Sequence, residues 1–143
     1  TNLLDKRIGG KVEFLKGQKG DWIDVDICIL KTKTDMKSVK TKIKFSKLSQ
    51  DDAVRALGNP KGIIGHTSLG RITALQIEKE DWQRIPIKKI NHDAAIGQGS
   101  SGGPLFDVGG NLIGFNTYAI QEGTTGGFGV ALSADHIEFV LDF

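Results

Sequence analysis

The sequence has little cysteine: among its 143 residues there is only Cys28. A single thiol excludes an internal disulfide. The residues beside it, Ile27, Ile29 and Leu30, are apolar. These surroundings favour a buried structural cysteine over a reactive one.

Long hydrophobic runs are also absent. No apolar stretch approaches the roughly 20 residues that a helix needs to span a bilayer. The first residues, Thr1 to Arg7, contain no apolar core of the kind found in a signal peptide. We therefore expect no membrane span, and the compartment of the protein stays open.

Charge of one sign is not in large excess, since the net charge is +2. Segment 31–47 has seven lysines, but Phe45 is its only aromatic residue and it contains no arginine. A nucleic-acid-binding stripe would interleave such side chains with the lysines. We interpret the segment as a solvated strand and connector, and expect no nucleic-acid partner.

What the sequence does have is apolar residues at every second position, the pattern of half-buried strands. Residues 25–30 and 38–45 show it, the second with apolar or Thr side chains between serine and lysines. Further strands are expected at 53–57, 70–77, 85–90, 104–106, 111–118 and 127–132. Gly109, Gly110 and Asn111 indicate a hairpin turn. Many short strands joined by glycine turns predict an all-β sandwich or barrel.

One helix is expected, at the end of the chain. Ser133 can cap it, and Ile137, Val140 and Leu141 fall on one face.

The segment with the most chemistry is 93–106, with the sequence Asp-Ala-Ala-Ile-Gly-Gln-Gly-Ser-Ser-Gly-Gly-Pro-Leu-Phe. Glycines on both sides of Ser101 allow a sharp turn and the close approach of a substrate. A serine nucleophile needs a base and a stabilised oxyanion, and the N–H groups of Gly99 and Ser101 are placed to stabilise one. A glycine-rich hairpin with two incidental serines is the alternative. A phosphate-binding loop is disfavoured because no Lys-Ser/Thr pair follows the glycines.

Several motifs in this order resemble trypsin-like serine proteases, particularly the HtrA/Deg family. Residues 93–106 resemble the nucleophile loop of that family, and residues 112–119 and 127–135 resemble the segments that follow it. Residues 56–62 and 70–74 resemble the beginning of the second barrel, and the likeness extends over residues 11–140. It implies a chymotrypsin-like double β-barrel whose N-terminal barrel is incomplete, with a short C-terminal helix. Residues 1–50 would be the remainder of the N-terminal barrel and a connector, and residues 51–143 the C-terminal barrel with nucleophile loop and helix.

The resemblance also implies a Ser-His-Asp mechanism on a polypeptide substrate, without metal or cofactor. The catalytic aspartate of the family begins a strand that residues 26–31, Asp-Ile-Cys-Ile-Leu-Lys, match. Asp26 is therefore the expected triad acid, in preference to Asp24. It would orient the histidine and stabilise its charged form.

No histidine precedes Asp26, although the family places its catalytic histidine there. His66, His92 and His136 all follow, and we interpret them as a loop, a strand-end and a helix-surface residue. We expect the base to come from an N-terminal segment that has been cleaved off or is present as a separate chain. The alternative is that the protein has lost catalysis.

The substrate pocket is expected to include Ala95, Asn116 and Gly129. Ala95 stands six residues before Ser101, where trypsin carries the acid that selects Lys or Arg. A pocket without that acid favours a small or medium apolar side chain before the cleaved bond.

Two other functions remain open. Residues 99–103 formally match the Gly-x-Ser-x-Gly motif of α/β-hydrolases, but that motif needs a helix directly after the serine, and Pro104 with the alternating strands argues against it. The other is a catalytically inactive module that holds peptides in the same cleft.

Overall fold

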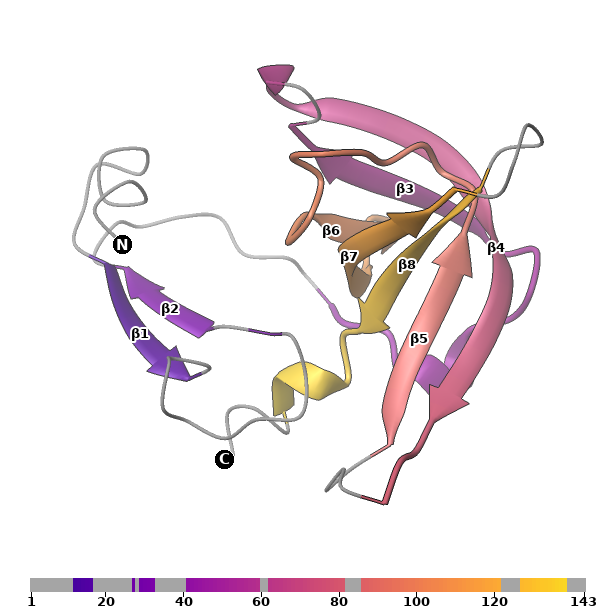
Figure 1. The fold of residues 1–143 in the computed structure, drawn as a ribbon, viewed down its shortest axis with the longest axis horizontal. Coiled ribbons are helices and arrows are strands. Elements are labelled where there is room, and N and C mark those ends of the chain that lie inside the picture. Colours follow the sequence, from indigo (N-terminus) through magenta and orange to yellow (C-terminus); the bar gives the residue numbers. More distant parts are fainter. Residues whose placement is uncertain are drawn as a thin grey trace.

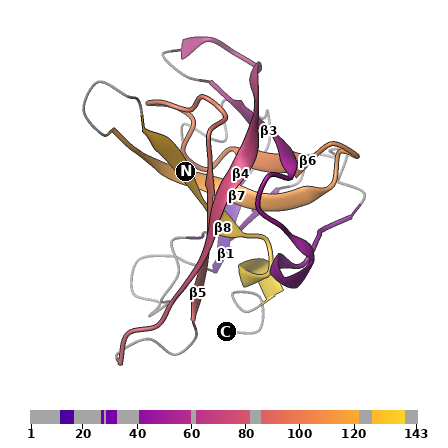
Figure 2. The ribbon, with the colours of Figure 1, turned by 90° about the vertical axis from the view of Figure 1, so that its right-hand side faces the viewer.

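The computed structural model describes residues 12–16, 27, 29–32, 41–59, 62–81, 86–121 and 127–138. Its main body is a closed antiparallel barrel with the strand order β3-β4-β5-β8-β7-β6 (Figure 1). The strands are β3 (Ala53–Gly58), β4 (His66–Glu78), β5 (Ile87–His92), β6 (Pro104–Asp107), β7 (Leu112–Ile120) and β8 (Phe128–Ser133). All six predicted strands of this region are confirmed, and the long β4 runs the full height of the barrel (Figure 2).

The barrel closes around one apolar core. Alternate residues of each strand face inward, as the sequence pattern requires of strands buried on one face. The core residues are Val54, Ala56, Ile72, Ile90, Ala94, Leu105, Ile113 and Ala131. Because β5 and β6 lie at separate places in the strand order, the connection from 93 to 103 must cross one end of the barrel. This connection contains the predicted nucleophile loop.

The predicted hairpin turn joins β6 to β7. Gly110 has a φ of 81°, and Asp107 Oδ1 accepts hydrogen bonds from the N–H groups of Gly109 and Asn111, both 2.9 Å long. A glycine adopts this backbone conformation at little cost, which is why the pattern Gly-Gly-Asn predicted the turn correctly.

The strand predicted over 38–45 is wrong where the structure describes it. Residues 41–44 form a single bridge, Lys42 to Leu112, and Phe45–Lys47 is a short 3₁₀ helix, η1. Ile43 and Phe45 nevertheless pack against the barrel core. The alternating pattern therefore comes from an extended segment that packs one face on the barrel and pairs with the beginning of β7 at a single residue, too little to form a strand of the sheet.

Two further strands, β1 (Val12–Lys16) and β2 (Ile29–Thr32), pair antiparallel in a separate two-stranded sheet. Within the described residues, no closed barrel forms in the N-terminal part of the chain. At the other end, residues 136–138 form a helical turn, and Ser133 Oγ accepts a hydrogen bond from the N–H of Asp135 at 3.2 Å. Residues 139–143, which include the predicted helix positions 140 and 141, lie outside the described residues. None of the described helical segments is long and apolar enough to cross a membrane.

Candidate active site

Ser101 lies at an exposed tight turn between two residues with left-handed backbone conformation. The φ angles of Gly99 and Gly102 are 95° and 82°. A side chain at either position would be strained. The neighbouring Ser100 is buried, with 4% of its surface exposed, so the two serines that adjoin in sequence have different surroundings. Only Ser101 presents its hydroxyl at the surface.

The end of β3 packs against the loop that carries Ser101. A Cβ atom built on Gly58 would lie 3.1 Å from both Cα and Oγ of Ser100, and one built on Gly103 would overlap the carbonyl oxygen of Leu57. Glycine is therefore required for close packing at 58 and 103, in addition to the conformational requirement at 99 and 102.

The backbone amides of Gly99 and Ser101 donate to no group in the part of the chain that is described. Other amides of the loop do have acceptors: Ser100 N–H donates to Gly97 O at 2.9 Å, and Gly103 N–H donates to Ser100 O at 3.0 Å. Stabilisation of an oxyanion requires free N–H groups of this kind, at the serine itself and two residues before it.

Strand β7 lies directly beside the serine and is irregular there. Its pairing with β8 shifts between Asn116 and Tyr118, so Thr117 is an extra residue. The carbonyl oxygen of Thr117 accepts a hydrogen bond from Ser101 Oγ at 2.8 Å. Bulges of this kind re-aim strand groups next to functional sites. Here the bulge brings a carbonyl to the hydroxyl, but a carbonyl cannot serve as a general base.

Two adjoining cavities open next to Ser101. The first, of about 340 Å³, is lined by Ile96, Gly97, Gln98, Ser100, Ser101, Thr117, Tyr118, Ala119 and Gln121. The second, of about 280 Å³, shares Ile96, Ala119 and Gln121 with the first and adds Asp93, Ala94, Ala95, Gly127, Phe128 and Gly129. Because they share these lining residues the two cavities lie side by side, and we refer to both as the depression beside Ser101.

The structure brings two of the three predicted pocket residues together. Ala95 and Gly129 line the second cavity, whereas Asn116 is 1% exposed and lines neither. Asp93 also lines the second cavity, so this space is not free of acidic groups. Its Oδ1, however, already accepts a hydrogen bond from the N–H of Arg71 at 2.7 Å.

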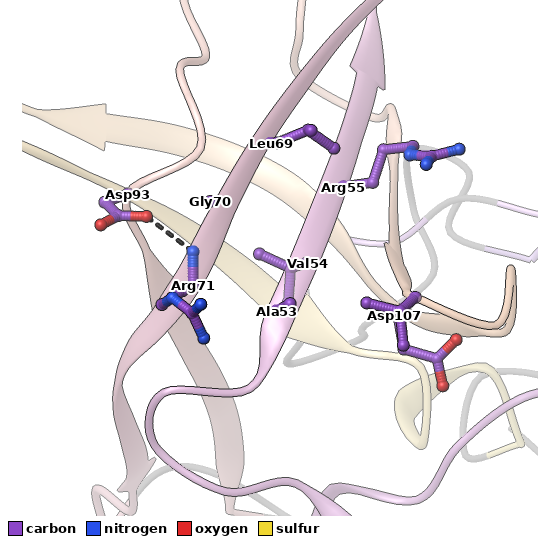
Figure 3. A pocket seen from close by; sticks show the side chains of 9 residues that line it. Ala53, Val54, Arg55, Leu69, Gly70, Arg71, Asp93 and Asp107 are labelled. Atoms are coloured by element: carbon purple, nitrogen blue, oxygen red, sulfur yellow. Dashed lines mark hydrogen bonds between the residues drawn. The ribbon is translucent and has the colours of Figure 1, made fainter.

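The largest described cavity, of about 560 Å³, lies elsewhere, over β3 and β4 (Figure 3). Arg55, Arg71, Asp93 and Asp107 contribute charges of both signs to it, and no residue from 94 to 103 lines it. Because it offers neither a nucleophile nor charge of one sign, we take the depression beside Ser101 as the candidate active site.

None of the three histidines is hydrogen-bonded to Ser101 in the described structure. His66 is exposed at the beginning of β4, His92 is fully buried on β5, and His136 is buried with Nε2 accepting from the N–H of Lys88 at 3.0 Å. The expected helix-surface position of His136 is therefore wrong. Asp24, Asp26 and Cys28 lie outside the described residues. No group of His, Cys, Asp or Glu side chains among the described residues could hold a metal ion.

Sequence reasoning missed a buried polar pair next to the site. His92 Nε2 and Asn116 Oδ1 are 2.8 Å apart. Burial lowers the pKa of His92 below its usual value, opposed in part by the hydrogen bond with Asn116 and by the Asp93 carboxylate. The signal available in the sequence was a histidine at an inward position of a strand, but its partner lies 24 residues away.

An antiparallel six-stranded barrel that carries an exposed serine in a glycine turn is the architecture of the chymotrypsin-type serine proteases. Residues 6–115 of the chain match the trypsin-like peptidase domain. The serine protease Do-like HtrB of Bacillus subtilis is 31% identical over 141 residues, which are 93% of this chain and 30% of that protein. The putative serine protease HhoA of Synechocystis is 40% identical over 98 residues, which are 66% of this chain and 24% of that protein.

A solved structure gives the same result. The HtrA-type protease AlgW, determined with a decapeptide, has a TM-score of 0.70 and 28% identity, and the match covers 92% of this chain and 39% of that one. The chain therefore belongs to the trypsin-like peptidase family, and its relatives are HtrA/Deg serine proteases. It spans less than two fifths of the length of these proteins.

Proposed function

We propose that this chain forms the nucleophile-bearing part of a serine endopeptidase. Ser101 attacks the substrate carbonyl, and the amides of Gly99 and Ser101 stabilise the resulting oxyanion. The observation that carries the proposal is the combination of an exposed serine, two amides without an acceptor among the described residues, and a cavity that begins at the serine.

A histidine from polypeptide outside these 143 residues acts as general base in this proposal, oriented by Asp26. The positions of the described histidines support an external base, since His92 and His136 are buried and hydrogen-bonded elsewhere. The hydroxyl of Ser101 must also leave the carbonyl of Thr117 before it reaches a base. The AlgW complex supports a peptide as the class of substrate.

Labelling with a fluorophosphonate tests the nucleophile, because this reagent reacts with activated serines. We expect the protein at its natural length to be labelled at Ser101, and Ser101→Ala to abolish labelling. Ser100→Ala serves as the matched control, since Ser100 is buried and its hydroxyl accepts only the N–H of Gly97 at 3.3 Å. A folded protein that binds peptides but is not labelled would instead be the inactive peptide-binding module.

Specificity is a separate proposal. The depression is lined largely by small and apolar residues, including Ala95, Ala119 and Gly129, so we expect cleavage after small or medium apolar side chains. Peptide-library profiling measures this preference. Asp93→Asn is the informative variant: a preference for Lys or Arg that disappears in it would contradict the proposal and identify Asp93 as a charge selector.

A further inference from the structure

The hydrogen bond between His92 and Asn116 crosses the barrel interior. His92 is on β5 and Asn116 on β7, and β8 lies between these two strands. The imidazole fits because its pairing partner on β8 is Gly129: a Cβ there would lie 2.8 Å from His92 Cε1 and 2.9 Å from Nε2. This is a second role for Gly129, besides lining the cavity.

The same asparagine holds the nucleophile loop through its backbone. Its carbonyl oxygen accepts the N–H of Gly102 at 2.7 Å, and its N–H donates to Gly103 O at 2.9 Å. These two bonds fix the turn immediately after Ser101. The next residue, Thr117, accepts the Ser101 hydroxyl. Any displacement of Asn116 is therefore passed directly to Gly102 and Gly103, the two residues that follow the nucleophile.

We propose that His92 is a positioning residue: its neutral ring holds the side chain of Asn116, and Asn116 in turn holds the turn that places Ser101. The inference rests on the proposed function for its catalytic consequence, but the structural coupling can be tested separately. Asn116 Oδ1 only accepts hydrogen bonds, so the neutral ring donates from Nε2.

Two buried atoms beside this hydrogen bond indicate that the positioning of Asn116 depends on the neutral form of the His92 ring. His92 Nδ1 and Asn116 Nδ2 are both buried without a hydrogen-bond partner among the described residues. A proton on Nδ1 would add a buried charge, which is costly. This cost of burial outweighs the hydrogen bonds with Asn116 and with the backbone of Ala94, which favour the charged ring. Within the described part of the chain, the charged group that acts on the ring is the Asp93 carboxylate, next in sequence on the connection that leaves β5. The described neighbours from β7, β8 and Ile96 bring no charge.

Two variants of His92 distinguish the effect of its hydrogen-bond donor from the effect of the volume that its ring fills. His92→Leu removes the donor, whereas His92→Gln retains an N–H donor at similar reach and does not titrate. His136→Leu is the matched control, because it removes another buried, hydrogen-bonded histidine that does not contact the loop.

The primary measurement is amide hydrogen exchange of Gly102, in the protein at its natural length. We expect His92→Leu to accelerate it by about tenfold relative to amides elsewhere in the barrel, His92→Gln to restore it, and His136→Leu to leave it unchanged. In the wild type, the protection of the Gly102 amide relative to other barrel amides should fall on acidification as the His92 ring protonates, and this pH dependence should be absent in His92→Gln.

Fluorophosphonate labelling then tests the catalytic consequence, with Ser101→Ala as the blank. If the wild type is not labelled although Gly102 exchange responds as expected, the proposed function fails and the positioning role stands. Equal Gly102 exchange in wild type and His92→Leu overturns the positioning role. So does an equal effect of His92→Leu and His136→Leu, or a failure of His92→Gln to rescue.

Discussion

At the scale of single residues, the loop around Ser101 depends on glycines for two different physical reasons. A side chain has no space at Gly103, where a Cβ would overlap the Leu57 carbonyl, and little space at Gly58, where a Cβ would lie 3.1 Å from Ser100. Gly102 has open space around it but a positive φ, so a side chain there has space and the wrong backbone conformation. The two requirements predict different consequences of substitution.

Gly102→Ala should lower the free energy of unfolding by roughly 1–2 kcal/mol, because an L-residue pays about that for the left-handed conformation. It should also slow the labelling of Ser101, since relaxation of the strain moves the turn. Gly97→Ala is the control: a Cβ there meets nothing within 4 Å and its φ is not positive. Chemical denaturation of both variants measures the difference, and equal stabilities would show that φ at 102 imposes no constraint.

At the scale of elements, the helical turn at 136–138 is attached to β5 by polar contacts. The N–H of Lys88 donates to His136 Nε2, and Lys88 Nζ lies 3.1 Å from Asp135 Oδ2. Asp135 also accepts the N–H of Phe45, at 3.2 Å from Oδ2. One aspartate and one histidine therefore connect the turn with β5 and with η1. The buried neutral state of His136 makes this attachment sensitive to pH.

Stability should fall on acidification because of this histidine. Burial lowers the pKa of His136 in the folded protein, Lys88 acts in the same direction, and Asp135 opposes them. Below the ordinary histidine pKa of about 6.5 the unfolded chain binds a proton that the folded chain does not, so the free energy of unfolding decreases as pH falls further. His92 contributes with the same sign.

Denaturation curves between neutral and mildly acidic pH measure this effect. His136→Leu should reduce the pH slope, although it also lowers stability at neutral pH by removing the acceptor of Lys88 N–H. The slope is compared within each variant, relative to that variant's own stability at neutral pH. A slope that is unchanged in His136→Leu would contradict the assignment.

At the scale of the whole molecule, the period-two pattern predicted the six barrel strands because each buries one face in a shared core. The pattern could not tell the extended segment at 41–44 from a strand, since both bury alternate residues and only the presence of a neighbouring strand separates them. Nor could it find the bond between His92 and Asn116, which exists only because the barrel brings β5 and β7 to either side of β8. The tight turn around Ser101 was predictable because the glycines that form it lie within five consecutive residues.

We expect the 143-residue chain by itself to have little or no peptidase activity, because the proposed histidine base lies outside it. Loss of a triad member typically costs on the order of a millionfold in turnover. Unpaired amides of the kind found at Gly99 and Ser101 leave a residual rate of roughly a thousandfold over water. Addition of a polypeptide that supplies the histidine should restore activity, and Ser101→Ala should abolish what is restored. Peptide hydrolysis assays on the purified chain, with and without that polypeptide, measure both steps. Full turnover by the chain alone would place the base within it, and His66, the exposed one of its three histidines, would be the first to replace.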